Sequence, residues 1–468
     1  MNKNIKQYEE YREAKQSWLK KIPMHWREAK SKRLFLETSA KNYPHEELLS
    51  ATQSHGVIPR SMLKTRVVMP TGNLETFKLV KEGNFVISLR SFQGGLEYSK
   101  YRGIVSPAYN ILEERTNQSR DYYKYLFKSH DFIGELQRNV TGIRQGKNID
   151  VNDFMEIMLP IPPLEEQMKI VKYLDNQLLK INKFIKAKKK LITVLKEQKQ
   201  AVIDEAMTKG LKPDFNMKYS DIKWLGNIPE HWECNKIKRF AKISPSKSEK
   251  FKQYSLEDEV VFLPMDKISN YGDIDNTERR PIHSVKEGFT YFEKNDVVVA
   301  KITPCFENGK GACLDNLETQ IGFGTTELVV LRANEKMLPK YLYLITRTSY
   351  FRKLGAEVMT GAAGQKRVPS DFISNFSIGV PDTNEQSKII EHIYCQIEKI
   401  DNSITVTQKQ IDLILEYRTS LISNVVTGKI NVQNMEVDYS KENYLNIEDT
   451  EEDTIELEEV LEGKECEV

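Results

Sequence analysis

Groups of residues that could carry out chemistry are sparse in this sequence. Residues 361–366, Gly-Ala-Ala-Gly-Gln-Lys, come closest to a phosphate-binding loop, but the segment is too short and lacks the hydroxyl residue that would hold magnesium. A metal-dependent nuclease needs clustered carboxylates near a lysine. The nearest approach is Asp214 with Asp221 and Lys223, which are tightly spaced in a polar connecting stretch. The seven histidines offer no pair at metal-ligand spacing. The sequence therefore predicts no catalytic residue and no metal site.

Residues suited to reading DNA bases gather instead at turns that follow expected strands. Arginine or lysine can bind guanine O6 and N7, and asparagine or glutamine can bind adenine. Residues 89–95 and 301–310 each end an apolar run in a polar turn that contains glycine, and residues 141–148 and 360–367 add two similar stretches. The candidate DNA-binding residues are Arg90, Ser91, Gln93, Arg144, Gln145, Lys147, Asn148, Lys301, Asn308, Lys310, Gln365, Lys366 and Arg367. The alternative for each is a solvated loop residue, or a phosphate contact that positions the protein without specifying sequence.

The net charge agrees with a polyanion as the partner. The chain holds 69 basic and 67 acidic residues, but residues 448–468 alone contain 11 acidic residues and one lysine. The remaining 447 residues therefore carry 68 basic and 56 acidic residues, a net charge of +12. Such an excess favours binding to nucleic acid, although many globular proteins also carry it.

The composition predicts a cytoplasmic protein. Five scattered cysteines without CxxC spacing suit reduced thiols better than disulfides or zinc. No run of 18 apolar residues could span a membrane, and the N-terminus lacks the apolar region of a signal peptide. We therefore expect no membrane partner.

One motif occurs twice and defines a repeat. The pattern Leu-x-x-Ile-Pro-x-His-Trp stands at residues 19–26 and again at 225–232. A second pair of matching segments begins at Thr-Gly and ends in Glu-Gln, at residues 141–167 and 360–386. Matches in the same order indicate a tandem duplication. His25 and His231 belong to the repeated pattern, so we predict a packed structural role for them.

Two long helices follow the repeated segments. The first shows a regular apolar stripe at Ile170, Leu174, Leu178, Ile181, Ile185, Ile192, Leu195, Val202 and Ala206. Every position 219 residues later is also apolar: Ile389, Ile393, Ile397, Ile400, Ile404, Ile411, Ile414, Leu421 and Val425. This spacing predicts amphipathic helices with a coiled-coil seam. We expect the two helices to pack on each other with pseudo-two-fold symmetry, the alternative being that each packs on its own domain.

The regions between the repeated segments, roughly 27–159 and 233–378, do not resemble each other in sequence. Both contain short apolar runs bounded by turn residues, at 84–89 and 109–112 in the first and at 296–300 and 327–331 in the second. We interpret these runs as strands of mixed α/β domains. A repeated framework with different contents would present two different recognition surfaces.

Over residues 17–431 the chain resembles the specificity subunits of type I restriction-modification systems, through its Ile-Pro-x-His-Trp motifs, its Pro-Leu-Glu-Glu-Gln helix start at 163–167 and its long helices. The second helix start, Pro-Asp-Thr-Asn-Glu-Gln at 381–386, departs from the pattern. The resemblance implies two target recognition domains, each reading half of a bipartite DNA site, and paired helices that dock two methyltransferase (M) subunits. Restriction-translocase (R) subunits would complete the complex, with S-adenosylmethionine, ATP and magnesium bound by the other subunits and no cofactor on this chain.

The expected fold is a mixed α/β tandem repeat in which two target recognition domains are joined by two long antiparallel coiled-coil helices. We expect an N-terminal extension at 1–18, recognition domain 1 at 19–160, spacer helix 1 at 161–211, a linker at 212–224, recognition domain 2 at 225–380, spacer helix 2 at 381–430 and an acidic, disordered tail at 431–468. Two alternatives remain: a self-contained restriction or methylation enzyme, which the missing motifs disfavour, and a coiled-coil scaffold without DNA, which the basic charge disfavours.

Overall fold

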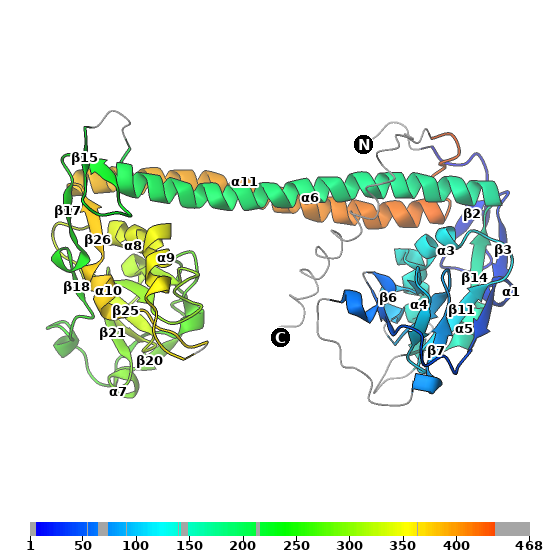
Figure 1. The fold of residues 1–468 in the computed structure, drawn as a ribbon, viewed down its shortest axis with the longest axis horizontal. Helices are drawn as coiled ribbons and strands as arrows, with labels where there is room; N and C mark the ends of the chain where they lie inside the picture. The colour runs from blue at the N-terminus through cyan, green and yellow to red at the C-terminus, as the bar shows by residue number, and fades with distance from the viewer. Residues whose placement is uncertain are drawn as a thin grey trace. The chain divides into compact units, whose positions relative to one another are not determined.

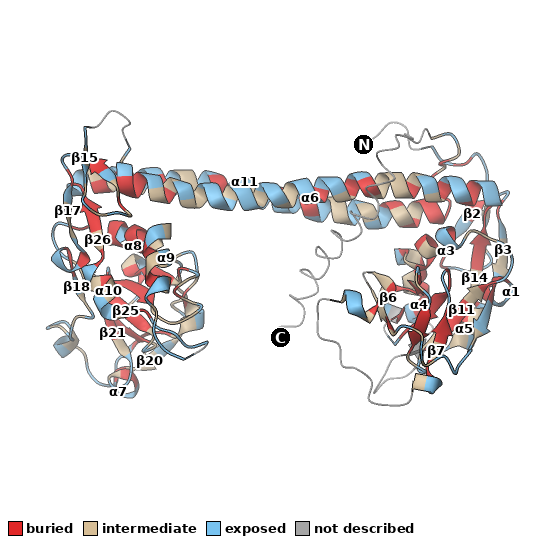
Figure 2. Cartoon of the chain, in the orientation of Figure 1, coloured by how far each residue is buried: buried red, intermediate tan, exposed pale blue. Residues whose placement is uncertain are grey.

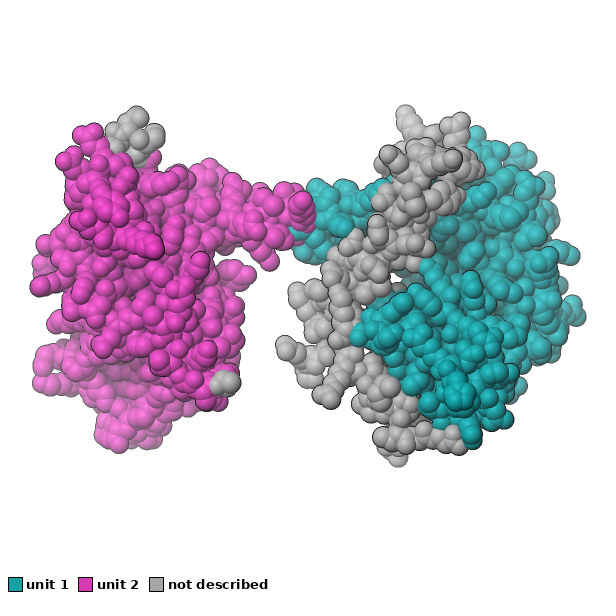
Figure 3. Space-filling model, in the orientation of Figure 1, with its two compact units in different colours: residues 1–189, 408–468 teal, residues 190–407 magenta. Residues whose placement is uncertain are grey.

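The computed structural model describes residues 6–53, 55–63, 74–89, 91–138, 140–141, 148–211, 216–362 and 364–435, apart from the side chains of residues 92, 140, 141 and 148. The chain divides into two compact units (Figure 3). Unit 1 comprises residues 1–189 and 408–468, and unit 2 comprises residues 190–407. The mixed α/β class predicted from the sequence is confirmed.

The first domain, in unit 1, is built on a four-stranded antiparallel sheet. Its strand order is β4 (Phe35–Thr38), β11 (Asn110–Glu114), β8 (Phe85–Ile87), β9 (Glu97–Tyr98). The shorter strand pairs are β5 (Leu49–Thr52) with β6 (Gly56–Pro59), β7 (Lys78–Val80) with β10 (Gly103–Val105), and β12 (Val140–Thr141) with β13 (Asn148–Ile149). The helices are α1 (Ser31–Leu34), α2 (Ser91–Gly94), α3 (Arg120–Phe127), α4 (His130–Arg138) and α5 (Val151–Glu156).

The second domain, in unit 2, repeats that central sheet. The strand order is β18 (Ala241–Ile243), β25 (Leu328–Ala333), β22 (Val297–Ala300), β23 (Gly311–Cys313). A second sheet has the order β20 (Arg279–Pro281), β19 (Glu259–Leu263), β24 (Ile321–Gly324), β21 (Thr290–Glu293), with β19 and β24 parallel. The helices are α7 (Ile282–Val285), α8 (Pro339–Arg347), α9 (Ser349–Glu357) and α10 (Ser370–Asn375).

The two domains therefore share one topology although their sequences differ. Each central sheet runs from an edge strand through the longest strand to a fully buried inner strand, β8 in one domain and β22 in the other. Figure 2 shows that the strands of both domains are largely buried. A buried strand requires only apolar side chains of suitable volume, so different sequences can satisfy the same sheet order.

The long helices are α6 (Leu164–Lys209, 46 residues) and α11 (Thr383–Val426, 44 residues) (Figure 1). In unit 2 the second half of α6 lies beside the first half of α11, where Lys199 Nζ approaches Asp401 Oδ2 to 2.7 Å. In unit 1 the first half of α6 lies beside the second half of α11, and burial together with the nearby Tyr417 raises the pKa of Tyr173. The predicted antiparallel pairing of the helices is confirmed.

The apolar stripe of each helix also serves the domains. Ile389 and Ile393, at the start of α11, are fully buried in the core of the second domain. The end of α6 joins the same core through Ile203, Ala206 and Met207. Each domain is thus built on the start of its own long helix and on the end of the other. Stripe residues near the middle of the helices are not uniformly buried: Ile192 is half-buried, whereas Ile411 on α11 is 2% exposed.

Residues 6–18 and 216–224, expected to be an extension and a linker, belong to the packed units. Strand β1 (Tyr11–Glu13) pairs with β2 (Lys21–Pro23), and β15 (Met217–Tyr219) pairs with β16 (Asn227–Pro229). These ladders satisfy the backbone groups of the two Ile-Pro motifs. The remaining pairs are β3 (Arg27–Lys30) with β14 (Met158–Ile161) and β17 (Glu233–Lys236) with β26 (Ser377–Val380).

The acidic tail at residues 436–468 lies outside the described residues. In the part of the chain that the structure describes, no helix has both the length and the apolar character to cross a membrane.

Candidate nucleic-acid interface

The turn that follows β22 brings together the two candidate segments of the second domain. Residues 301–310 form a closed loop, because Ala300 N–H donates to the Lys310 carbonyl at 2.9 Å. Thr303 N–H donates to the Lys366 carbonyl at 2.9 Å, and Val368 N–H donates to the Lys301 carbonyl at 2.8 Å. Segments 301–310 and 360–367 therefore form one surface, a proximity that the sequence does not reveal. We call these two segments the recognition turn of domain 2.

Six side chains of this recognition turn are cationic or amide. Asn308, Gln365, Lys366 and Arg367 are exposed, and Lys301 and Lys310 are half-buried. The turn also carries the carboxylate of Glu307, whose Oε1 accepts a weak hydrogen bond from Thr303 Oγ1 at 3.4 Å. The six predicted residues thus occupy a surface suited to phosphate and base-edge contacts.

Arg367 is paired with the carboxylate of Glu327, the residue directly before β25. Its Nε and Nη2 donate to the two oxygens of Glu327 at 2.9 and 2.8 Å. The Arg367 guanidinium lowers the pKa of the Glu327 carboxyl, and Lys301 acts in the same direction. A planar guanidinium that forms two parallel hydrogen bonds is the geometry that also recognises guanine or phosphate.

In the first domain only two of the predicted DNA-binding residues, Ser91 and Gln93, have described side chains. Ser91 is fully buried in α2, and its hydroxyl accepts a hydrogen bond from Ser88 N–H at 2.8 Å, which contradicts the prediction that this side chain contacts DNA. The hydroxyl stabilises the turn instead. Gln93 is exposed on α2. Arg90, Arg144, Gln145 and Lys147 lie outside the described residues, and Asn148 is described only in its backbone. Helix α2, which carries Gln93, lies against β13, which begins at Asn148, so described parts of the two candidate segments are again neighbours.

The repeated histidines and tryptophans hold the starts of the long helices. His25 Nε2 and Trp26 Nε1 contact the two carboxylate oxygens of Glu166 at 2.8 and 3.1 Å. His231 Nε2 and Trp232 Nε1 contact Glu385 in the same way, at 2.7 and 3.2 Å. These contacts support a structural role for the histidines, but the two rings are 44% and 42% exposed and are not packed in the interior as predicted. Sequence reasoning missed the two glutamates, although the Glu-Gln pair that begins both helices was a visible signal.

The glutamines of those pairs tie each helix to its domain. Gln167 Oε1 accepts from Ser119 N–H at 2.9 Å, and Gln386 Oε1 accepts from Leu338 N–H at 2.8 Å. Each amide nitrogen donates to the carbonyl of the proline before its helix, Pro162 or Pro381. Both side chains are fully buried, so the orientation of each helix start is fixed by identical contacts.

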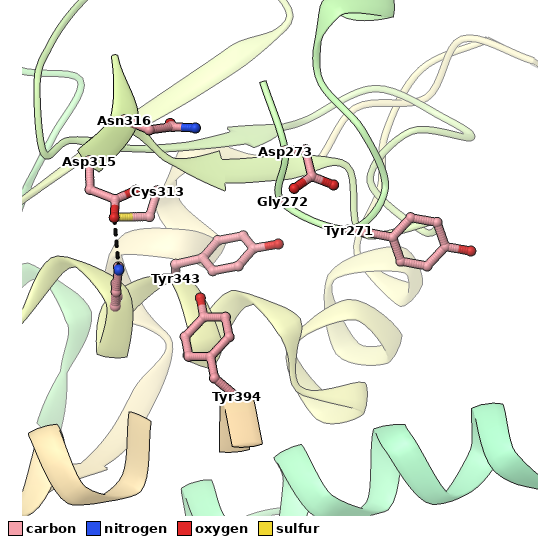
Figure 4. Close-up of a pocket in the computed structure, with 9 residues that line it drawn as sticks. Tyr271, Gly272, Asp273, Cys313, Asp315, Asn316, Tyr343 and Tyr394 are labelled. Atoms are coloured by element: carbon pink, nitrogen blue, oxygen red, sulfur yellow. Dashed lines mark ion pairs between the residues drawn. The ribbon is translucent and has the colours of Figure 1, made fainter. Parts of the chain in front are cut away.

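Unit 2 also contains a polar hollow of about 230 Å3 (Figure 4). It lies between α8, the start of α11 and the loops after β19 and β23, and is lined by Tyr271, Gly272, Asp273, Cys313, Asp315, Asn316, Lys340, Tyr343 and Tyr394. Lys340 Nζ and Asp315 Oδ2 form an ion pair of 2.8 Å. Burial raises the pKa of the Cys313 thiol to about 12, which makes it a poor nucleophile. Among the described residues no group of three or more His, Cys, Asp or Glu could hold a metal ion.

Comparison with known proteins places this architecture in a family. Residues 34–194 and 229–416 match the family described as the type I restriction modification DNA specificity domain. The chain is 42% identical over 165 residues to the specificity subunit of the type I restriction enzyme EcoAI of Escherichia coli, covering 35% of this chain and 27% of that one. It is 34% identical over 202 residues to the EcoEI specificity subunit of Escherichia coli, covering 43% and 33%. These two alignments span only about a quarter to a third of the relatives' length.

A third relative is matched over most of its length. The MjaVIII specificity subunit of Methanocaldococcus jannaschii is 27% identical over 374 residues, covering 76% of this chain and 81% of that one. Among solved structures, a chain from a study of assembly of the type I restriction-modification system superposes with a TM-score of 0.62 at 12% identity, covering 86% and 98%. The HsdS subunit from Thermoanaerobacter tengcongensis superposes at 0.51 with 14% identity, covering 87% and 98%. The chain therefore belongs to the type I restriction-modification specificity family.

Proposed function

We propose that this subunit reads a bipartite, asymmetric DNA site, with one half of the site recognised by each domain. The observation that carries the proposal is that two sheets of identical strand order present unlike turns after their inner strands. The turn after β8 forms the short helix α2, whereas the turn after β22 forms the cationic loop 301–310. Equivalent scaffolds with different surface chemistry suit two different half-sites.

We further propose that two methyltransferase subunits dock on the long helices and that restriction-translocase subunits complete the complex. Helices α6 and α11 expose large apolar side chains, which in a water-soluble helix favour contact with another protein: Phe184, Leu191, Val194, Val406, Leu413 and Tyr417. S-adenosylmethionine, ATP and magnesium would bind to those other subunits, and the complex would act in the cytoplasm.

An exchange of one domain tests whether each domain recognises its own half of the DNA site. Residues 27–159 are replaced by the corresponding region of another specificity subunit, the complex is expressed with its methyltransferase subunit, and methylated sites are mapped by genome-wide sequencing. Only one half of the methylated site should change. Replacement of residues 233–378 is the matched control and should change only the other half.

Three results would contradict the proposal. A purified chain that associates with neither duplex DNA nor a methyltransferase subunit would exclude a specificity role for it. Cleavage or methylation of DNA by the chain alone would favour a self-contained enzyme. A change in both halves after exchange of one domain would show that recognition is not divided between the domains.

A further inference from the structure

Helices α3 and α8 are equivalent elements of the repeat, residue for residue. Ser129 Oγ donates to the Leu126 carbonyl at 2.7 Å, and Thr348 Oγ1, 219 residues later, donates to the Ile345 carbonyl at 2.8 Å. The residue before each hydroxyl is a cation, Lys128 in the first domain and Arg347 in the second. These two cations therefore occupy the same place, at the end of the helix that faces the turn.

Arg347 fixes the recognition turn of domain 2. Its Nη1 donates to the carbonyl of Gly309. Gly309 has φ +71°, and a Cβ placed on it would lie 2.4 Å from that same Nη1, so turn and guanidinium are in direct contact. A charge-assisted hydrogen bond to a carbonyl at the tip of a turn restricts its backbone more than a neutral one does. The positions of Asn308 and Lys310 on either side depend on this contact.

Arg347 is itself anchored to α6. Its carbonyl accepts a hydrogen bond from Gln200 Nε2 at 3.0 Å. Ser349 N–H donates to Asp204 Oδ1 at 2.8 Å, which holds the start of α9 to the same stretch of α6. The recognition turn is thus connected through one arginine to the long helix.

Lys128 occupies the corresponding place in the first domain, where its ammonium group contacts segments that border the turn containing α2. We call the turn that contains α2 the turn of domain 1. Lys128 Nζ donates to the Gln53 carbonyl at 3.0 Å and to Glu97 Oε2 at 2.7 Å. Glu97 begins β9, the strand that follows α2, and it is 1% exposed. A Cβ on Gly95, at the end of the turn, would lie 2.0 Å from the carbonyl oxygen of Phe127. The end of α3 therefore holds the turn of domain 1 as the end of α8 holds that of domain 2.

We infer that Lys128 and Arg347 are equivalent positioning residues, each of which controls recognition of one half-site by fixing the turn of its own domain. The inference rests on the proposed function, because it requires that each domain read its own half. Neither residue is required to touch DNA. Substitution of either one should change recognition of one half of the site, whereas misfolding of the chain would change recognition of both halves.

The test uses the complex with its methyltransferase subunit and the variants Lys128→Met and Arg347→Met. Dissociation constants are measured for the cognate duplex and for duplexes with single-base changes in each half. Arg347→Met should reduce discrimination roughly tenfold in the half read by domain 2 and leave the other half unchanged. Lys128→Met should do the reverse, so each variant is the control for the other. Arg347→Lys, which keeps a cationic donor, should recover part of the discrimination.

The salt dependence of binding separates positioning from contact. A residue that binds phosphate contributes about one unit to the slope of log K against log salt concentration, and its loss lowers the slope. Both methionine variants should keep the wild-type slope. A lower slope, or an equal loss of discrimination in both halves, overturns the inference. A wild-type complex without a two-part preference overturns the proposed function instead.

A second variant alters the contact between Arg347 and Gly309 on the side of the turn. Gly309→Ala adds a methyl group against Arg347 at a positive φ and leaves α8 unchanged. It should weaken discrimination in the same half as Arg347→Met. If Arg347→Met does not fold, as judged by circular dichroism, Gly309→Ala and Arg347→Lys decide the question, and wild-type discrimination in Gly309→Ala would overturn the inference.

Discussion

The guanidinium of Arg367 is held by Glu327 on a surface that carries three lysines and one further carboxylate, Glu307, and this pair illustrates how a recognition residue can be oriented before its ligand binds. The two hydrogen bonds orient the planar group while the half-buried Lys301 lies nearby. Surface ion pairs contribute little to stability. Arg367 can therefore replace its hydrogen bonds to Glu327 by hydrogen bonds to a phosphate or a guanine at a small cost in free energy. Because the guanidinium is already oriented, it loses little conformational freedom on binding.

Arg367→Ala should weaken binding of the cognate duplex roughly tenfold to hundredfold, because one bidentate contact is lost. Glu327→Gln, which removes the competing carboxylate charge, should bind the duplex no more weakly than the wild type. Fluorescence anisotropy of the complex with labelled duplex measures both. Arg279→Ala is the control, since Arg279 is also a partly exposed arginine paired with a glutamate, Glu318, in the same domain. Equal losses in the two arginine variants would argue against a specific role for Arg367.

Cys313 should resist alkylation by iodoacetamide. Burial raises the pKa of this thiol to about 12, so at pH 8 roughly one molecule in 10,000 carries the reactive thiolate. The exposed Cys395 on α11 serves as the internal standard. Mass spectrometry of protein labelled between pH 7 and 9 should show Cys395 modified first and Cys313 protected throughout. Modification of both at similar rates would indicate that the second domain opens readily.

At the scale of elements, the starts of the long helices are held by a repeated set of polar contacts, of which those made by the two glutamines are the most buried. The carboxylates of Glu166 and Glu385 are hydrogen-bonded to the histidine and tryptophan of the motif. The side-chain amides of Gln167 and Gln386 are hydrogen-bonded to backbone groups of the domain. Because each glutamine satisfies backbone groups of two other segments, it fixes the helix axis relative to the sheet. The direction of each long helix is thus determined by side chains of the first turn.

Gln386→Ala should lower the free energy of unfolding of unit 2 by about 1–3 kcal/mol, since the Leu338 N–H and the Pro381 carbonyl lose the partner that this fully buried side chain provides. Urea unfolding followed by tryptophan fluorescence measures the change. Glu398→Ala, at an exposed position on the same helix and in the same unit, should change stability by less than about 0.5 kcal/mol. A smaller effect at Gln386 than at Glu398 would mean that the buried glutamine does not stabilise the helix start.

At the scale of the molecule, the two ends of the described chain are joined to each other by hydrogen bonds in unit 1. In unit 1 the Asn431 N–H donates to the Lys6 carbonyl at 2.8 Å, and the Tyr11 hydroxyl donates to the Gly428 carbonyl at 3.1 Å. In unit 2 the next element after α6 in the chain is β15, the counterpart of β1. One junction is therefore made by hydrogen bonds and the other by the covalent chain.

A circular permutant should consequently fold. Such a chain begins at Asn216, continues from Met435 through a short glycine-serine linker into Lys6, and ends at Leu211. Its circular dichroism spectrum should match that of the parent, and its melting temperature should stay within a few degrees, because the contacts are preserved. A permutant opened within α6 at residue 190 is the control and should be strongly destabilised. Equal destabilisation of both permutants would show that the covalent linker at 212–215 is essential.

The sequence by itself determined the features that depend on local periodicity. The stripes at Ile170 and Ile389, with their matching continuations, predicted two long amphipathic helices that pack on each other, since an apolar face of that length must be buried. The repeated Ile-Pro-x-His-Trp motif indicated the duplication. Apolar runs such as 296–300 predicted strands, because they are short and bounded by turn residues.

Only the tertiary structure decided which distant residues meet. It buried Ser91, placed residues 301–310 beside 360–367, and gave two dissimilar domains the same strand order. It also joined Glu166 to His25, across 141 positions of sequence, and Arg347 to Gly309. The physical reason is that periodicity records which face of an element is apolar, whereas contacts between elements depend on how those faces pack together, and no single segment encodes that packing.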